Sequence, residues 1–209
     1  MDMFRREEFQ QWGAVGGKLS HRHLPPSVAR QMALKSAEVR RNGSKAGQCK
    51  EKKPHGTEEW ASHNINIQLG CEHDCRYCYA KSMGIRFQRA TSKSWRKPVI
   101  LRDKVEQNYR KMDGRIMFPT SHDITPLNIN ECSSVLQKLL HSGNEVLIVT
   151  KPHLSCIQTL CKDLQLYKMK VMFRFTIGSA DDSVLSFWEP EAPPFKERIA
   201  SLKWAYGQG

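Results

Sequence analysis

From residue 64 to the end of the 209-residue chain, short apolar runs alternate with longer amphipathic segments. The short runs are typical of buried strands, whereas apolar residues three or four positions apart in the longer segments are typical of helices. Strands that alternate with helices along a chain form parallel sheets with right-handed crossovers. The alternation therefore predicts an α/β fold with about four parallel βα units.

The pattern also gives the approximate bounds of each element. We expect strands at residues 64–70, 115–121, 145–151 and 170–179. We expect helices from about Ala80, at 102–112, at 128–143, at 153–164 and at 193–209. Gly143 is well placed to end the third of these helices, because glycine readily adopts the conformation that follows a helix.

Polar side chains stand at the end of every expected strand. In chain order they are Cys71, then Thr120 and Ser121, then Lys151, then Thr176 and Ser179. Binding sites of parallel α/β proteins form where the carboxyl ends of the strands meet. The four strand ends are therefore predicted to build one shared site.

The loop after the first expected strand, LGCEHDCRYCYA, holds Cys71, Cys75 and Cys78, three of the seven cysteines of the chain. Thiolates this close together are typical of metal centres. Zinc takes four tetrahedral ligands, and His73 or His63 is available as the fourth. A [4Fe–4S] cluster held by three thiolates leaves one iron open to a further ligand. His73 lies between two of the cysteines and is poorly placed to close the same tetrahedron, so the spacing favours the iron–sulfur cluster.

The arrangement Cys71-x3-Cys75-x-Tyr77-Cys78, with an aromatic residue before the last cysteine, resembles the signature of the radical S-adenosylmethionine (radical SAM) superfamily. GCEHDCRYCYA most resembles the branch that contains spore photoproduct lyase and its uncharacterised relatives. The later stretches VTK, FRFTIGS and EPEAPPFKERIASL resemble blocks of the same branch in the same order. The resemblance covers about residues 60–209 and implies a partial (βα) radical SAM barrel.

The resemblance implies a lyase-like radical SAM enzyme. The three cysteines would hold a [4Fe–4S] cluster whose open iron binds S-adenosylmethionine, and a reductant such as flavodoxin or ferredoxin would supply an electron. Reductive cleavage would then give a 5′-deoxyadenosyl radical that abstracts hydrogen from a substrate. The substrate is unknown, with nucleic acid as one candidate.

The resemblance also implies roles for the residues at the strand ends. It implies cofactor contacts from Tyr77 to the adenine, from Thr120 and Ser121 to the methionine amino group, from Lys151 (or less directly Arg198) to the carboxylate, and from Thr176 and Ser179 to the ribose hydroxyls. Each contact has a structural alternative. Ser and Thr after strands often cap the next helix, and Lys151, which precedes Pro152, has a solvated surface position as its less favoured alternative.

Two features depart from the superfamily pattern. The superfamily core usually has six βα units, and the four expected here predict an incomplete barrel with an exposed edge strand. Photoproduct lyases carry a hydrogen-donating cysteine in a Cys-Thr-Ser sequence near the end of the second strand. The matching stretch here begins with Pro119, which cannot donate that hydrogen. The sequence therefore predicts a substrate other than a thymine dimer.

Residues 1–60 differ from the core predicted at 61–209. They contain 12 Lys and Arg and few apolar residues, which predicts an irregular, partly helical basic extension. The whole chain has a formal net charge of +12, which favours polyanionic partners such as DNA or RNA. A basic protein without an anionic partner has the same composition.

The sequence also limits the compartment. It has no apolar run of about 18 residues, so we expect no membrane span. It lacks the apolar region of a secretory signal at its start. The odd number of cysteines, clustered in one loop, argues against a secreted disulfide framework. We therefore expect a cytoplasmic protein with reduced thiols, and the sequence does not indicate its oligomeric state.

Two other functions stay compatible with these observations. One is a zinc-stabilised nucleic-acid-binding protein without catalytic activity. The other is a radical SAM fragment that binds a cluster but is inactive. The remaining cysteines lack ligand-like spacing, so we expect no second cluster.

Overall fold

The computed structural model describes residues 30, 31, 34 and 56–209. Residues 56–209 belong to one compact unit. Most of the basic extension expected at 1–60 lies outside the described residues. The described unit combines a parallel sheet with helices, which confirms the predicted α/β class.

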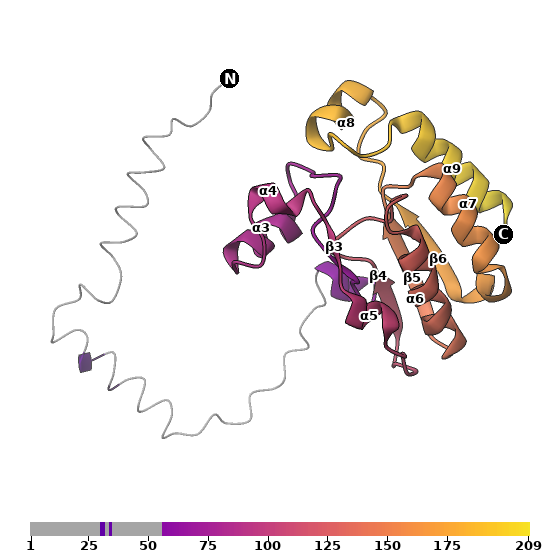
Figure 1. Ribbon diagram of the computed structural model, residues 1–209, viewed down its shortest axis with the longest axis horizontal. Coiled ribbons are helices and arrows are strands. Elements are labelled where there is room, and N and C mark those ends of the chain that lie inside the picture. Colours follow the sequence, from indigo (N-terminus) through magenta and orange to yellow (C-terminus); the bar gives the residue numbers. More distant parts are fainter. Residues whose placement is uncertain (1–29, 32–33, 35–55) are drawn as a thin grey trace. The chain divides into compact units, whose positions relative to one another are not determined.

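The main sheet has four parallel strands in the order β1–β4–β5–β6. They span His63–Asn64, Arg115–Phe118, Glu145–Thr150 and Val171–Phe175. The sheet is open within the described part of the chain, with β1 and β6 as its edges. Figure 1 shows that α6 (Ile129–His141), α7 (Leu154–Asp163) and α9 (Phe195–Gly207) lie side by side next to the sheet.

Alternation along the strands gives the sheet two different faces, because successive side chains of a strand point in opposite directions. Ile116 of β4 and Ile148 of β5 belong to the main core with the apolar stripe of α6, which includes Leu136 and Leu139. Met117 and its neighbours on the other face form only a small apolar cluster. The helices therefore bury one face, and the other is available for a site.

The first expected strand, 64–70, is not continuous, and this prediction was wrong. β1 pairs with β4 in the main sheet, whereas β2 (Gln68–Leu69) pairs antiparallel with β3 (Val99–Ile100) in a separate ribbon. Asn66, between them, uses its side chain to bind the backbone after β4. That bond takes the chain out of the parallel ladder before the cysteine loop.

The other elements follow the prediction with shorter bounds. The helix expected from Ala80 is α3 (Tyr79–Arg86), and the helix expected at 102–112 ends early as α5 (Arg102–Glu106). Tyr109 still packs on the core from the irregular segment after α5. The sequence did not indicate four short helices: η2 (Gly56–Glu59), α4 (Ser92–Trp95), η3 (Gln165–Lys170) and α8 (Asp182–Trp188). Among the described residues, every helix is too short or too polar to cross a membrane.

Candidate functional site

A cavity of about 260 Å³ opens at the carboxyl ends of β4, β5 and β6. Eight residues predicted for the site line it: Cys71, Cys75, Tyr77, Cys78, Thr120, Ser121, Lys151 and Thr176. They come from the cysteine loop and from three different strand ends. The structure therefore brings together the groups that the sequence predicts to share one site.

The cysteine loop is folded tightly against α4. Cys71 and Cys75 are buried, Cys78 is partly buried, and all three are free thiols. Gly70 precedes the loop with φ at +90°, and a Cβ atom there would lie 2.6 Å from the carbonyl oxygen of Trp95. The Cys78 side chain also caps α3, where its sulfur accepts a hydrogen bond from the Lys81 backbone N–H at 3.4 Å. Only glycine fits the start of this loop without strain.

The environment of Cys71 and Cys75 opposes the ionisation of their thiols while no cation is bound. Burial, together with the negative charge of Asp123, raises the pKa of the Cys71 thiol to about 12. Burial likewise raises the pKa of the Cys75 thiol to about 11, against the opposing charge of Lys151. Metals bind the thiolate form, so a bound metal would displace protons from these groups.

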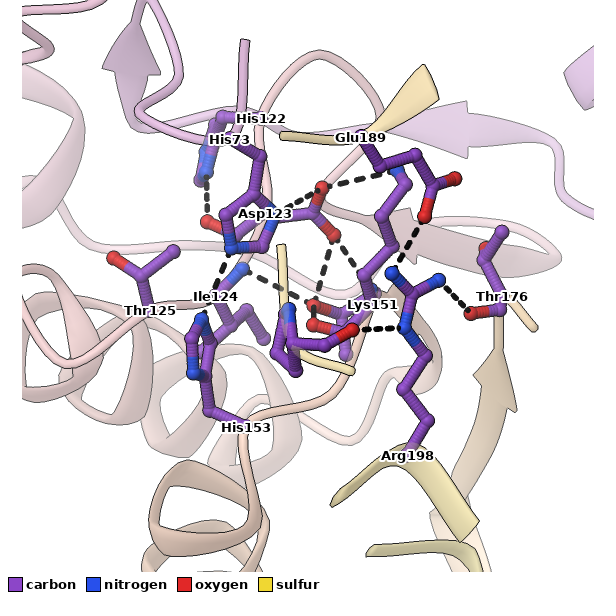
Figure 2. Close-up of polar contacts among 12 residues, drawn as sticks. His73, His122, Asp123, Ile124, Thr125, Lys151, His153, Thr176, Glu189 and Arg198 are labelled. Carbon is purple, nitrogen blue, oxygen red and sulfur yellow. Dashed lines mark hydrogen bonds and ion pairs between the residues drawn. The ribbon is translucent and has the colours of Figure 1, made fainter. Parts of the chain in front are cut away.

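Asp123 is the centre of a polar network beside the cysteines (Figure 2). One carboxylate oxygen accepts hydrogen bonds from the Thr150 hydroxyl at 3.0 Å and from the Lys151 backbone N–H at 2.7 Å. The other lies 3.1 Å from His73 Nδ1 and 3.3 Å from Lys151 Nζ. Burial alone would raise the pKa of Asp123, but the bond to His73 and the charge of Lys151 outweigh it, so the net shift is downward.

The network ties the cysteine loop to two helices. His73 is fully buried between Cys71 and Cys75, and its Nε2 lies 3.0 Å from His153 Nε2 at the start of α7. His153 Nδ1 in turn lies 3.7 Å from a Glu197 carboxylate oxygen in α9. Burial and the nearby His73 lower the pKa of His153. The loop is therefore fixed from β4, α7 and α9 at once.

Lys151 is a buried cation at the cavity wall. Burial opposes its charge, but Asp123 raises the pKa of Lys151 above its ordinary value. Its Nζ also lies 5.9 Å from the centre of the Tyr77 ring. The alternative reading of Lys151 as a solvated surface residue is wrong, because only 13% of its side chain is exposed.

A second buried pair supports Tyr77. Arg198 is fully buried and lies 2.6 Å from the Glu189 carboxylate, which accepts a hydrogen bond from the Tyr77 hydroxyl. Arg198 also donates to the carbonyl oxygens of Pro193 at 2.7 Å and Thr176 at 3.2 Å (Figure 2). Burial and the bond to Glu189 raise the pKa of Tyr77. Arg198 therefore contacts only protein partners among the described residues, and it does not line the cavity. A contact from Arg198 to the cofactor carboxylate, the weaker of the two carboxylate predictions, would require it to line the cavity.

The loop after β4 is positioned by Asn66. Its Oδ1 accepts hydrogen bonds from the backbone N–H groups of Thr120 at 2.7 Å and Ser121 at 2.8 Å, and its amide donates to the Thr120 hydroxyl at 2.8 Å. Neither residue caps α6, which begins later at Ile129. The peptide bond between Phe118 and Pro119 is cis.

Ser179 lies apart from the other predicted residues. It lines a neighbouring pocket of about 360 Å³ with Tyr77, Trp188 and Glu189. Its hydroxyl accepts a hydrogen bond from the Asp181 backbone N–H at 3.0 Å, so it also shapes the turn into α8. Tyr77 lines both pockets and is the residue that connects them.

The donor set allows two metal arrangements. Cys71, Cys75 and Cys78 all line the cavity of about 260 Å³, as a cluster with three protein ligands requires. Alternatively, ligand atoms of Cys71, His73 and Asp123 all lie within 4.8 Å of one another. His63, the other zinc ligand considered from the sequence, lies in β1 and does not line the cavity.

Two uncharacterized proteins are similar to this chain. ORF301 of Acidianus two-tailed virus is 28% identical over 164 residues, which cover 71% of this chain and 52% of the relative. MJ0683 of Methanocaldococcus jannaschii is 26% identical over 155 residues, which cover 71% of this chain and 57% of the relative. The chain thus spans about half the length of these curated relatives. No family model and no solved structure matches the chain.

Proposed function

We propose that this chain is a radical SAM enzyme of the spore photoproduct lyase-like group. Cys71, Cys75 and Cys78 would hold a [4Fe–4S] cluster, which, when bound and reduced, supplies the electron for cleavage of S-adenosylmethionine. The observation that carries the proposal is the joint placement of these free thiols, in this spacing, around one cavity at the carboxyl edge of a parallel sheet. The open sheet would then be part of a (βα) barrel.

The residues around the thiols suit such a cofactor. Lys151 supplies a positive charge for a carboxylate, and Asp123 keeps that side chain charged despite its burial. Ser121 and Thr176 offer polar groups at two other strand ends. Tyr77, held by Glu189, gives the cavity an aromatic wall against which an adenine ring can pack. In this proposal Ser179 serves the neighbouring pocket and contacts a ribose only if the ligand extends past Tyr77.

Selective loss of iron tests the cluster assignment. After anaerobic reconstitution, the wild-type protein is expected to bind about four irons and four sulfides per chain. Replacing Cys71, Cys75 or Cys78 by Ala should abolish this uptake. Cys161→Ser is the matched control, because Cys161 is a partly buried free thiol outside the loop. Equal iron in all variants would refute the assignment.

Zinc binding by a non-catalytic protein is a second candidate, favoured by the closeness of Cys71, His73 and Asp123. The two centres need different residues. Cys78→Ala should abolish the cluster and spare a zinc site, whereas Asp123→Asn should weaken zinc binding more than cluster binding. A zinc content of about one per chain, lost in Asp123→Asn and kept in Cys78→Ala, would favour this candidate.

An inactive cluster-binding fragment is the third candidate, because the relatives are about twice as long as the matched part. Production of 5′-deoxyadenosine by this chain, driven by dithionite or reduced flavodoxin, separates an active from an inactive protein.

We further propose a cytoplasmic location, a flavodoxin- or ferredoxin-type reductant, and a substrate other than a thymine dimer because of Pro119.

A further inference from the structure

Helix α3 exposes its large side chains and buries its small ones. Its buried residues are Ala80 and Gly84, and Gly84 lies against the ring of Trp95. The exposed large residues are Tyr79 at 61%, Met83 at 45%, Ile85 at 39% and, just after the helix, Phe87 at 52%. Helices of soluble domains normally bury such residues. The outer face of α3 therefore has the composition of a contact surface.

The same surface is strongly positive. From residue 75 to residue 102 the chain contains no Asp or Glu, and its basic residues are Arg76, Lys81, Arg86, Arg89, Lys93, Arg96, Lys97 and Arg102. In the described part of the chain, Lys81 and Arg96 form ion pairs with Asp74, which precedes this run. Arg86 and Arg89 form none there. Their charges are available to a partner.

The cations and an aromatic ring are combined at the end of α3. The guanidinium carbons of Arg86 and Arg89 lie 5.7 and 5.6 Å from the centre of the Phe87 ring. An exposed ring with two guanidinium groups close to it offers a flat apolar surface next to positive charge. Stacked bases and the phosphates beside them require this combination.

The cavity lies beside this surface, and a similar pair of a cation and a ring is found next to Tyr77, which lines the cavity. Tyr79 and Ala80, at the first turn of α3, line the cavity, about 10 Å along the helix from Phe87. Next to Tyr77, Arg76 lies 4.4 Å from the centre of the exposed Phe187 ring. Figure 1 shows α3 and α4 together at the end of the unit away from α7 and α9. An extended ligand bound along α3 would therefore reach the cavity directly.

We propose that the outer face of α3, centred on Arg86, Phe87 and Arg89, binds single-stranded nucleic acid. Unpaired bases stack on Phe87 and the two arginines contact phosphates. A duplex hides its base faces, so it would use only the charges. An acidic protein segment or an anionic membrane would also use the charges but has no planar bases to stack. This inference does not depend on the proposed cluster, because it concerns a surface outside the cysteine loop.

Fluorescence anisotropy with the full chain tests the stacking. The probe is a labelled oligothymidylate of about 12 nucleotides. Phe87→Ala should weaken binding about tenfold, the effect of losing one stacked base. Phe87→Trp should keep the affinity, whereas Phe87→Leu, which keeps an apolar group without a ring, should weaken it like Ala. Unchanged affinity in both Phe87→Ala and Phe87→Leu would overturn the proposal.

Salt dependence tests the phosphate contacts. The double variant Arg86→Ser, Arg89→Ser should reduce the slope of log K against log salt by about 1.4, since each phosphate contact on a single strand contributes about 0.7. Lys168→Ser, Lys170→Ser is the matched control, because these exposed lysines lie in η3 and carry the same charge. If both double variants reduce the slope of log K against log salt equally, the oligonucleotide is attracted by the overall positive charge and not by specific contacts, and the proposal is overturned.

Competing ligands test the partner class. The same affinity for duplex DNA, polyglutamate or phosphatidylserine vesicles, with the same dependence on Phe87, would overturn the assignment to single strands. All measurements are made on protein with and without reconstituted iron and sulfide. If nucleic-acid binding fails in both preparations, the assignment of the cluster to the three cysteines still stands. If the protein takes up no cluster, nucleic-acid binding by α3 still stands.

Discussion

The buried pair of Arg198 and Glu189 allows a quantitative prediction. The Arg198 side chain is fully buried and the Glu189 side chain is 2% exposed, with 2.6 Å between their charged groups. Replacing Arg198 by Met keeps much of the apolar stem but leaves the Glu189 carboxylate buried without its cation. It also removes the bonds to the carbonyl oxygens of Pro193 and Thr176.

Breaking a buried ion pair by removing one partner costs about 3–5 kcal/mol. Stabilities of single domains are about 5–15 kcal/mol, so this loss is a large fraction of the total. For a domain of this size it corresponds to a fall in melting midpoint of about 10 °C. The Tyr77 hydroxyl still donates to Glu189 in the variant, which favours the lower end of the range.

Urea denaturation at pH 7 measures the loss. The double variant Glu189→Gln, Arg198→Met should recover part of it, because no uncompensated charge then stays buried. Arg174→Met is the control: Arg174 is an exposed β6 residue that contacts the Trp60 ring, and its loss should cost less than about 1 kcal/mol. A comparably small loss in Arg198→Met, or a double variant no more stable than the single one, would refute the reasoning.

Three further predictions follow from the loop and its network. Gly70→Ala should destabilise the protein more than Gly56→Ala in thermal melts, since both glycines have positive φ but only Gly70 has a backbone atom within 3 Å of the added Cβ. Asp123→Asn should cost stability at pH 7, and urea titrations should show the gap to wild type closing as the pH falls below about 4, because a carboxyl with a lowered folded pKa stabilises only where it is ionised. Zinc or cobalt added to apoprotein in weak buffer should release at least one proton, that of the Cys71 thiol, and release of none would mean that this thiol is already ionised or does not bind the metal.

Local patterns were sufficient for the elements with a clear apolar face. α6 and α7 lie within their expected ranges, because their buried apolar residues recur with helical spacing. α9 also lies within its expected range, although the residues that it buries are polar, Arg198 and Ser201. α8 was missed because it buries only Leu185 and exposes Phe187 and Trp188, so no apolar stripe marks it. Its capping residue, Asp181, was the available signal.

Long-range contacts account for what the sequence could not give. The first strand divides because Asn66 binds backbone groups more than 50 residues away. The expectation that a site forms at the carboxyl ends of parallel strands correctly located the cavity and most of the residues predicted to line it. It did not indicate Asp123, which lies beyond the expected end of β4, or the contact of His73 with His153, which are 80 residues apart. A buried Asp near a lysine and two histidines leaves no periodic signal in a single sequence.

The measurement that tests the central claim most directly is electron paramagnetic resonance of the reconstituted, dithionite-reduced protein, recorded before and after addition of S-adenosylmethionine. The account predicts a reduced [4Fe–4S] signal that S-adenosylmethionine shifts, because one iron lacks a protein ligand. Cys78→Ala should show neither the signal nor the shift. A cluster whose spectrum S-adenosylmethionine leaves unchanged, or a protein that takes up zinc and no iron, would contradict the account.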